Sequence, residues 1–401
     1  MRSKWCFLLL VILLLIAVRP LLAADAAGKM TPEEIRAKCA EIDAKCAAAM
    51  QNVEDLQALK AELLRDLGES VPPPAAKPSA WAEKVVINGY FQNRYEHFSP
   101  DVGAGAANED RFGMRRLYVN MLIKTSGRAS GVLTFGSDGP NIKTTNATWN
   151  NIFCDYKVTD QDTVRFGQGP TNFGLEAWQS SGQRLPFERA AFNEGGSRGK
   201  PAGLYFLGWN DRGLWWIHTP PDQTRMPQAV VSVVNGSFLN DPLNNNRALA
   251  VDLKWKPKWG MYGISWLNST FSQPTGRTWH PGVPEGPFAR NAWDGYVRHV
   301  TPNNWALQVE GAGGRMAGHS MRGWYGQFEK MFPQAPGTAF VKYEWYNPNT
   351  NDDDSADIYR AWVLGYAHQL DNNSRITAQG TWGKAGEKTP REAGLQWQYG
   401  F

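Results

Sequence analysis

Charged side chains stand at alternate positions in several short stretches of this chain, with apolar side chains between them. The polar rows contain Arg94, Arg116, Lys124, Asp155, Lys157, Arg165, Lys254, Arg298 and Lys342. Around Arg116, for example, Leu117 and Val119 alternate with Tyr118. A period of two places one set of side chains on each face of a strand. A wet face of mixed charge can guide dissolved ions, although each charge can equally be a solvated residue paired with a nearby acid.

The histidines argue against catalysis, because they stand singly in the sequence. They are His97, His218, His280, His299, His319 and His368. If the alternating strands closed into a barrel, an enzyme of that kind, such as a phospholipase or protease, would need a Ser or Asp held against a His at the barrel rim. His319 and Ser320 are adjacent, but adjacent residues in a strand or turn seldom face each other. We therefore expect no enzyme, no catalytic residues, no cofactor and no metal. The acidic run at Asp352–Asp354 is interpreted as a solvated loop, with a calcium site as the alternative.

The composition excludes two broad classes of protein. The 401 residues have a mean hydropathy of −0.46. Beyond the first 25 residues or so, no apolar run is long enough to span a membrane as a helix. The net charge of +4 is too small to argue for nucleic-acid binding. In contrast, 18 Trp, 18 Phe, 13 Tyr and 40 Gly suit a transmembrane β-barrel, which has a wet interior and aromatic rims.

Residues 1–24 have the pattern of a secretory signal peptide. Arg2 and Lys4 precede an apolar core from Phe7 to Val18, and small residues follow at Ala23 and Ala24. The cysteines beyond this segment are Cys39, Cys46 and Cys154. An odd number of cysteines cannot all pair within one chain.

Residues 25–70 are predicted to form a coiled-coil helix, followed by a stiff, proline-rich linker over residues 71–82. Ile35, Ile42, Ala49, Leu56 and Leu63 recur every seven residues. This spacing favours a seam between helices, and a helix folded back onto the rest of the chain is the alternative. Cys39 and Cys46 lie roughly 10 Å apart along such a helix, too far for a disulfide within it. They either pair between neighbouring chains or serve as small core residues.

Residues 83–401 are predicted to form an antiparallel barrel of sixteen strands. The strands are expected at 84–97, 111–124, 129–137, 147–158, 162–169, 202–208, 213–235, 246–256, 259–271, 292–301, 304–313, 321–331, 338–347, 357–370, 373–384 and 391–401. Residues 213–235 are treated as one strand, despite Pro220 and Pro221, because dividing it gives an odd count. Short connections are expected at 126–128, 159–161, 209–211, 256–258, 301–303, 332–337 and 371–372. The long ones are expected at 98–110, 138–146, 170–201, 236–245, 272–291, 314–320, 348–356 and 385–390. This alternation is typical of bacterial outer-membrane barrels, which have tight periplasmic turns and longer external loops.

The last nine residues have the pattern of a closing strand. Leu395, Trp397, Tyr399 and Phe401 share one face and should contact lipid, while Gln396 and Gln398 share the other. In a barrel with an even number of strands, 391–401 must pair with 84–97. An Arg or Lys on the lipid face near the bilayer centre costs roughly 2–4 kcal/mol, so the charged rows must face the interior. Cys154 alternates with Asp155 and is expected to be lipid-facing and inert.

Several motifs resemble the phosphate- and polyphosphate-selective porin family, known as porins O and P. They are Ile87–Gln92 with Tyr95, the Arg115-Arg116 pair, Val164–Glu176, Leu185–Ala190, Gly203–Phe206 and Val233–Gly236. They follow the family order over roughly residues 85–401. The resemblance implies a 16-stranded barrel, a homotrimer, a long third loop folded inward at 170–201, and a terminal Phe401 read by the outer-membrane assembly machinery. Deleting Phe401 should then impair membrane insertion before transport.

The charges of the expected constriction loop depart from those of phosphate-selective members. Its basic residues are Arg184, Arg189, Arg198 and Lys200, and its acidic ones are Glu176, Glu188 and Glu194. Phosphate-selective members line the pore with a dense Arg/Lys ladder, whereas the rows here are mixed in sign. We therefore expect passive diffusion of small hydrophilic solutes across the outer membrane, with at most a weak preference for anions or phosphate. The alternative is a barrel-anchored tether or adhesin whose periplasmic coiled coil contacts the cell-wall peptidoglycan.

Overall fold

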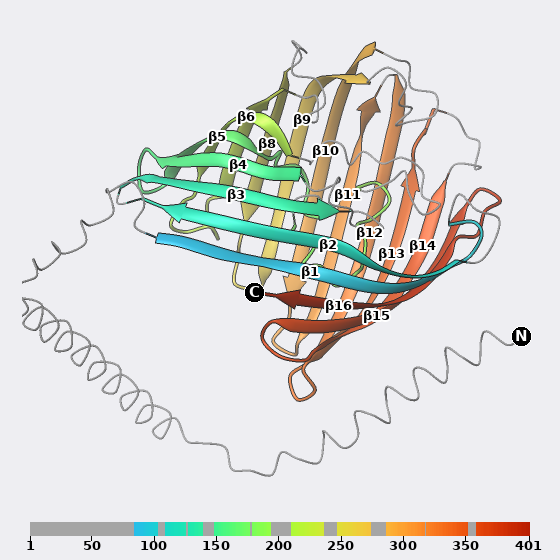
Figure 1. Ribbon diagram of the computed structural model, residues 1–401. Coiled ribbons are helices and arrows are strands. Elements are labelled where there is room, and N and C mark those ends of the chain that lie inside the picture. Colours follow the sequence, from blue (N-terminus) through green and yellow to red (C-terminus); the bar gives the residue numbers. More distant parts are fainter. Residues whose placement is uncertain are drawn as a thin grey trace, which may run out of the picture. The chain divides into compact units, whose positions relative to one another are not determined.

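The chain forms a closed antiparallel barrel of sixteen strands (Figure 1), as expected from the sequence. The computed structural model describes residues 84–102, 109–125, 127–138, 148–176, 179–193, 210–235, 247–273, 286–316, 318–351 and 358–401. The strands are β1 (Lys84–Phe98), β2 (Glu109–Lys124), β3 (Ala129–Asp138), β4 (Thr148–Lys157), β5 (Asp162–Pro170), β6 (Asn210–His218), β7 (Gln228–Val234) and β8 (Ala248–Trp255). They continue with β9 (Gly260–Gln273), β10 (Gly286–Val300), β11 (Trp305–Met316), β12 (His319–Phe332), β13 (Gly337–Asn347), β14 (Tyr359–Gln369), β15 (Ser374–Ala385) and β16 (Arg391–Gly400). Each strand pairs with its neighbours in sequence, and β1 pairs with β16. The predicted signal peptide, coiled coil and linker lie outside the described residues.

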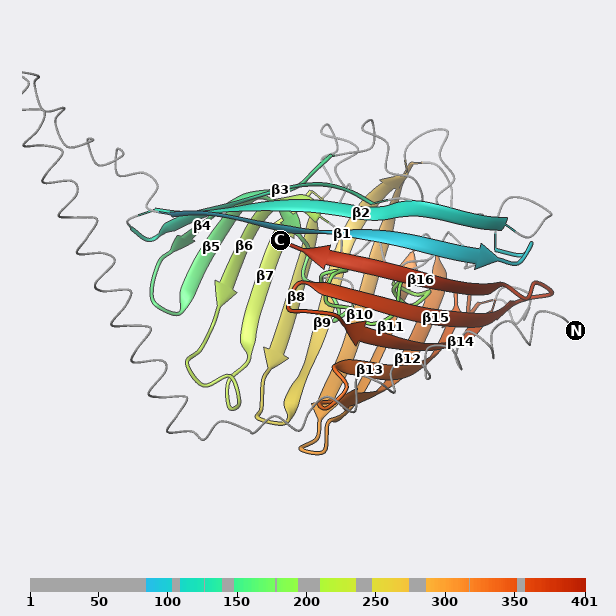
Figure 2. The same ribbon diagram turned by 60° about the horizontal axis from the view of Figure 1, so that its bottom comes forward.

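The two ends of the barrel sheet meet as the closing strand requires. Phe91 is paired with Tyr399, and the backbone N–H of Gly89 donates to the carbonyl oxygen of Phe401 at 2.9 Å. The N–H of Phe401 donates back to Gly89 at 3.0 Å. A Cβ at Gly89 would lie 2.6 Å from the Phe401 ring, so glycine provides the space for this ring. Figure 2 shows the C-terminus beside β1. The predicted pairing of the first and last strands is confirmed.

The predicted single strand over 213–235 is wrong. The structure has two strands there, β6 and β7, joined by a turn over 219–227. Pro220 and Pro221 lie in this turn, where neither ring needs to donate to a sheet ladder. The predicted short turn at 209–211 is also wrong in part, since Asn210 and Asp211 begin β6. The strand predicted at 202–208 lies outside the described residues.

One predicted long loop is short. Strands β11 and β12 extend to Met316 and from His319, so only residues 317 and 318 connect them, whereas 314–320 was the expected loop. Gly314, which was expected in the loop, lies in β11 with Gly313. A Cβ at Gly313 would lie 2.8 Å from the ring of Trp293. Glycine here lets the Trp293 ring of the neighbouring strand β10 pack over the backbone.

The two faces of the barrel wall differ as the alternation predicts. Exposed aromatic side chains cover the outside, including Phe112, Trp149, Phe166, Trp293, Trp362 and Trp397. Cys154 is also exposed. Charged side chains on the same strands are buried inside, among them Arg94, Arg116, Asp252, Glu310 and Lys342. No helix among the described residues is long and apolar enough to cross a membrane.

Candidate functional site

The segment after β5 turns into the barrel interior, where residues 171–176 and 179–193 contact the inner wall. The turn is made at Gly174, whose φ of 74° lies in the left-handed region that favours glycine. A Cβ there would lie 2.7 Å from a carboxylate oxygen of Glu310 and 3.1 Å from one of Asp294. Glycine therefore lets the loop backbone approach the acidic side of the wall closely.

The carboxylate of Glu310, on β11, holds the start of this loop. It accepts the backbone N–H of Leu175 at 2.8 Å and that of Glu176 at 3.0 Å. The hydroxyl of Tyr325 also donates to Glu310, at 2.7 Å. The N–H of Gly174 donates to Ser265 at 2.9 Å. Three consecutive backbone donors of the loop thus have partners on the wall, which fixes its path without any regular secondary structure.

A buried ion pair fixes the same part of the loop to β13. Lys342 Nζ lies 2.7 Å from Glu176 Oε1, with both side chains almost fully buried. The other oxygen of Glu176 accepts the N–H of Ala190 at 2.6 Å, and Arg189 Nε donates to the Glu176 carbonyl at 2.8 Å. Glu176 therefore joins the two limbs of the loop to each other and to the wall.

These contacts make the ionised form of Glu176 the stable one. Burial by itself would raise the pKa of this carboxyl group, but Lys342, Arg184 and the Ala190 N–H together lower the pKa below its ordinary value of 4.5. Because the folded-state pKa lies below the unfolded one, the ionised carboxylate contributes stability above pH 4.5. That contribution is lost as the pH falls through the folded-state pKa.

Three arginines of β1 and β2 converge on Glu188, in the second half of the loop. Glu188 lies 2.7 Å from Arg94, 3.1 Å from Arg115 and 2.8 Å from Arg116. Arg94 also pairs with Glu96 at 2.7 Å. Its guanidinium stacks over the ring of Phe187, 4.5 Å from the ring centre. One acidic side chain of the loop thus compensates several buried cations of the wall.

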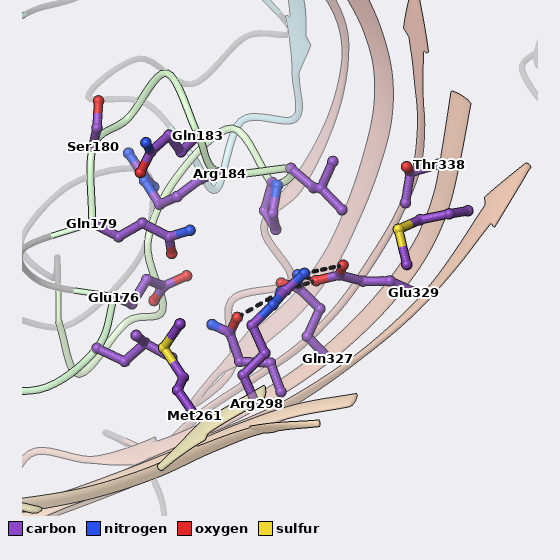
Figure 3. Close-up of a pocket in the computed structure, with 15 residues that line it drawn as sticks. Glu176, Gln179, Ser180, Gln183, Arg184, Met261, Arg298, Gln327, Glu329 and Thr338 are labelled. Atoms are coloured by element: carbon purple, nitrogen blue, oxygen red, sulfur yellow. Dashed lines mark hydrogen bonds and ion pairs between the residues drawn. The ribbon is translucent and has the colours of Figure 1, made fainter. Parts of the chain in front are cut away.

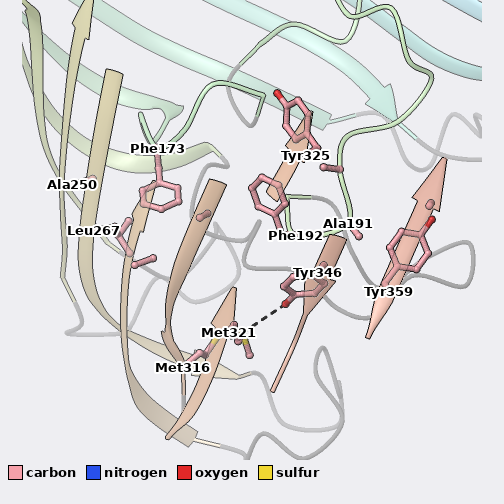
Figure 4. Close-up of a cluster of buried hydrophobic side chains, with 14 residues drawn as sticks. Phe173, Ala191, Phe192, Ala250, Leu267, Met316, Met321, Tyr325, Tyr346 and Tyr359 are labelled. Carbon is pink, nitrogen blue, oxygen red and sulfur yellow. Dashed lines mark hydrogen bonds between the residues drawn. The ribbon is translucent and has the colours of Figure 1, made fainter. Parts of the chain in front are cut away.

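Apolar contacts complete the attachment of the loop. Phe173, Ala190, Ala191 and Phe192 pack into a buried cluster with residues of β8 to β14 (Figure 4). The rings of Phe192 and Tyr325 are stacked with their centres 6.0 Å apart. The loop is therefore packed against the wall and hydrogen-bonded to it, which identifies the main apolar core of the described barrel as a loop–wall interface.

A cavity of about 550 Å³ remains between the loop and the inner wall of β9 to β13. The loop lines one side of it with polar groups such as Gln179, Gln183 and Arg184 (Figure 3). On the facing wall, Arg298 pairs with Glu329 at 2.7 Å and donates to Gln308 at 3.1 Å. The cavity also has apolar lining, from Leu175, Leu185, Pro186, Met261 and Met331. Opposite charges that already pair with each other leave only a weak field in this space.

The residues singled out in the sequence fall into three groups. Arg94, Arg116, Lys254, Lys342, Arg184 and Arg189 are buried on the inner side, with Glu188, Arg298, Arg165 and Asp155 partly accessible there. Arg165 pairs with Asp155 at 2.7 Å and lies over the Phe153 ring. Lys124 and Lys157 are exposed at the ends of β2 and β4. Glu194, Arg198, Lys200 and the acidic run at 352–354 lie outside the described residues.

Two kinds of inner-wall residue were missed. Arg115 points inward beside Arg116 because a register shift opposite Gln92 and Asn93 inserts one residue into β2. Strict alternation places Arg115 on the outer face. The only sequence signal for the extra residue in β2 is the pair of adjacent arginines, Arg115 and Arg116. Glu310 was missed although the alternation contains it, since Leu307 is exposed on the outside while Gln308 and Glu310 are buried.

The barrel, its aromatic outer face, its charged inner face and the inward loop define a porin-type channel of the outer membrane. Residues 85–216 match the family model described as phosphate-selective porin O and P, which confirms the resemblance over this part of the chain; the motif at Val233–Gly236 lies beyond the match. This family is one of channels and not of enzymes.

Solved porin structures share the fold at low sequence identity. OmpF of Salmonella typhi, in complex with daunomycin, has 11% identity and a TM-score of 0.57, over 79% of this chain and 98% of that one. OmpT of Vibrio cholerae, in a trimer form, has 10% identity and a TM-score of 0.56, over 79% and 99%. The channel DcaP of Acinetobacter baumannii has 11% identity and a TM-score of 0.55, over 81% and 99%. No curated protein sequence matches the chain.

Proposed function

We propose that the chain is a passive diffusion porin whose inward loop narrows the channel. The observation that carries this proposal is the attachment of one loop to distant parts of the wall. Its start is bound to β11 and β13 through Glu310 and Lys342, and its second half is bound to β1 and β2 through Glu188. Between these points the loop crosses the interior and leaves a polar cavity beside it. A loop held at both sides sets the width of the path that solutes must take.

The charges support weak selectivity, with a small preference for anions. Most inner charges of the described residues occur in pairs of opposite sign, such as Arg165 with Asp155 and Arg298 with Glu329. The arginines that line the cavities, Arg184, Arg298 and Arg375, outnumber the acids Glu176 and Glu329. Glu176 is moreover neutralised by Lys342. Among the described residues, this arrangement differs from the dense row of cations that would suit phosphate.

The reversal potential in a salt gradient tests this selectivity. With the purified chain in a planar bilayer and a tenfold KCl gradient, we expect open channels with a reversal potential of anion-selective sign. Its size should stay well below the ideal value, about 59 mV for a tenfold ratio of a monovalent ion. A reversal potential of cation-selective sign would refute the anion preference, and the absence of any open channel would refute the porin.

The homotrimer is a further part of the proposal. The OmpT structure with the same fold is described as a trimer form. Three barrels side by side would bring their N-termini together on the side of the short turns, where the predicted coiled coils of residues 25–70 could associate. Crosslinking at Cys39 or Cys46 in native membranes tests this arrangement, and purely monomeric species would exclude it. The alternative function, a tether to the cell wall, depends on the same predicted coiled coil of residues 25–70. The same crosslinking experiment therefore tests it.

A further inference from the structure

A second cavity, of about 430 Å³, lies at the end of the barrel with the short turns. It is bounded by the tip of the inward loop at Ser180 and Gly182 and by the inner faces of β1, β2, β15 and β16. Its volume lies within the range of small-molecule sites, roughly 300–1,000 Å³. Six amide side chains line it: Asn88, Asn120, Gln369, Asn372, Asn373 and Gln398.

Arg375 is the one charged residue among those that line this cavity. Its Nη2 donates to the carbonyl oxygen of Arg184 at 2.9 Å and to Gln398 at 3.2 Å. Its Nε is buried and has no hydrogen-bond partner among the described residues. No carboxylate of the described chain forms an ion pair with it, in contrast to Arg94, Arg165 and Arg298. The barrel thus holds a guanidinium that retains donors for an anion.

Some of the surrounding amides are held in place by hydrogen bonds, and others have side chains without a partner. Asn120 donates to Asn88 at 3.0 Å and accepts from Thr134 at 2.9 Å. Gln398 accepts from Gln92 at 2.8 Å, and its own amide nitrogen donates to Gly182 at 2.9 Å. The side chains of Asn372 and Asn373 have no hydrogen-bond partner within the described barrel. The cavity therefore offers free amide donors and acceptors around a single cation.

This combination distinguishes between ligand classes. Nη2 of Arg375 already donates twice within the protein and Nε is buried, so Nη1 is the guanidinium nitrogen that can donate a charge-assisted hydrogen bond to one carboxylate. Amide groups both donate and accept, so they suit hydroxyl groups, which also do both. A phosphate dianion offers acceptors and two charges, and would leave the amide oxygens unpaired and one charge without a cation. A neutral sugar would leave the guanidinium without a counter-charge.

We propose that this cavity is a binding site for a small polyhydroxylated monocarboxylate, that is, a sugar acid. The inference rests on the proposed porin function, since it names a solute class for the path beneath the loop. Arg375 binds the carboxylate, while the amides of β1, β2 and the 370–373 turn bind the hydroxyl groups. Because Arg375 also donates to the Arg184 carbonyl, the bound solute lies directly under the loop tip.

Titration calorimetry on the purified full-length chain tests the site without requiring a channel current. The probes are sodium gluconate, with sodium acetate, sodium phosphate and glucose as comparisons. Gluconate is expected to bind at least about tenfold more tightly than any of the three.

Arg375→Gln should weaken gluconate binding about tenfold or more, because the variant loses one charge-assisted hydrogen bond to the carboxylate. The matched control is Arg225→Gln, in the exposed 219–227 turn, where the arginine pairs only with Asp222 at 3.5 Å. It should leave binding unchanged.

Asn373→Asp is the second variant, because it keeps Arg375 and places a carboxylate at the exposed turn. It should weaken gluconate binding while the barrel stays folded by its heat-dependent gel mobility. Equal binding of gluconate and acetate, tighter binding of phosphate or glucose, or an unchanged affinity in Arg375→Gln would each overturn the proposal. Open channels in a bilayer together with no gluconate binding would remove this site and leave the porin. Gluconate binding without open channels would support the site and refute the porin function.

Discussion

Replacing Glu188 by Gln is expected to release the inward loop from the arginine-rich side of the barrel. Glu188 compensates Arg94, Arg115 and Arg116 at 2.7 to 3.1 Å, and the side chains of Arg94 and Arg116 are almost fully buried. Removing one partner of a buried ion pair costs up to about 3–5 kcal/mol, and here Arg94 keeps Glu96 as a second partner at 2.7 Å. The free energy of unfolding should fall by about this amount, which a denaturant titration of the folded barrel in detergent measures.

The same substitution should also change the current. A loop that is no longer held near β1 and β2 widens the path, so single-channel conductance should rise. The reversal potential should shift towards anions, because three guanidinium groups lose their common carboxylate. Glu329→Gln is the matched control, since it removes one carboxylate from the Arg298 pair on the wall without touching the loop. It should shift selectivity with little change in conductance. Equal conductance of Glu188→Gln and the original chain would contradict the anchoring role of Glu188.

The second large effect is expected at the buried pair of Lys342 and Glu176. Lys342→Met leaves the buried Glu176 carboxylate without its ion-pair partner, with Arg184 as the remaining nearby cation, at a cost of up to about 3–5 kcal/mol. The double variant Lys342→Met with Glu176→Gln should recover most of this loss, because a neutral amide still accepts the Ala190 N–H without needing a counter-charge. A double-mutant cycle on unfolding free energies measures the coupling.

The pH adds a second readout for this pair. Since Glu176 is ionised in the folded protein, acid should weaken the loop of the original chain as the pH falls below the ordinary glutamate value of 4.5. The double variant should lack this part of the acid sensitivity. If the double variant were destabilised by the sum of the two single effects, the pair would not act as a unit.

The sequence could predict the wall of the barrel well, because each strand shows its two faces through local alternation. The count of sixteen and the pairing of the first and last strands follow from a period of two and an even count, although the observed sixteen divide 213–235 into β6 and β7 and do not include the predicted strand at 202–208. The prediction failed where the even count was given more weight than the local turn signal. Residues 213–235 were merged into one strand to keep the count even, although Pro220 and Pro221 and the polar residues 222–225 mark the turn between β6 and β7.

The site was less predictable, because its contacts join residues that are far apart in the chain. Lys342 and Glu176 are 166 positions apart, and Glu310 and Leu175 are 135 apart. Alternation predicts which wall residues face inward. It does not predict which loop atom each of them contacts. The extra residue that turns Arg115 inward is likewise a property of strand register, which single residues do not encode.

Single-channel conductance distinguishes a barrel narrowed by its inward loop from an open one. The chain should be compared with a variant in which residues 171–201 are replaced by a short Gly-Ser link, with folding of both checked by gel mobility. If the loop sets the width of the path, the shortened chain will conduct at least severalfold more current in the same salt. Equal conductance of the two folded barrels would show that the loop does not narrow the channel.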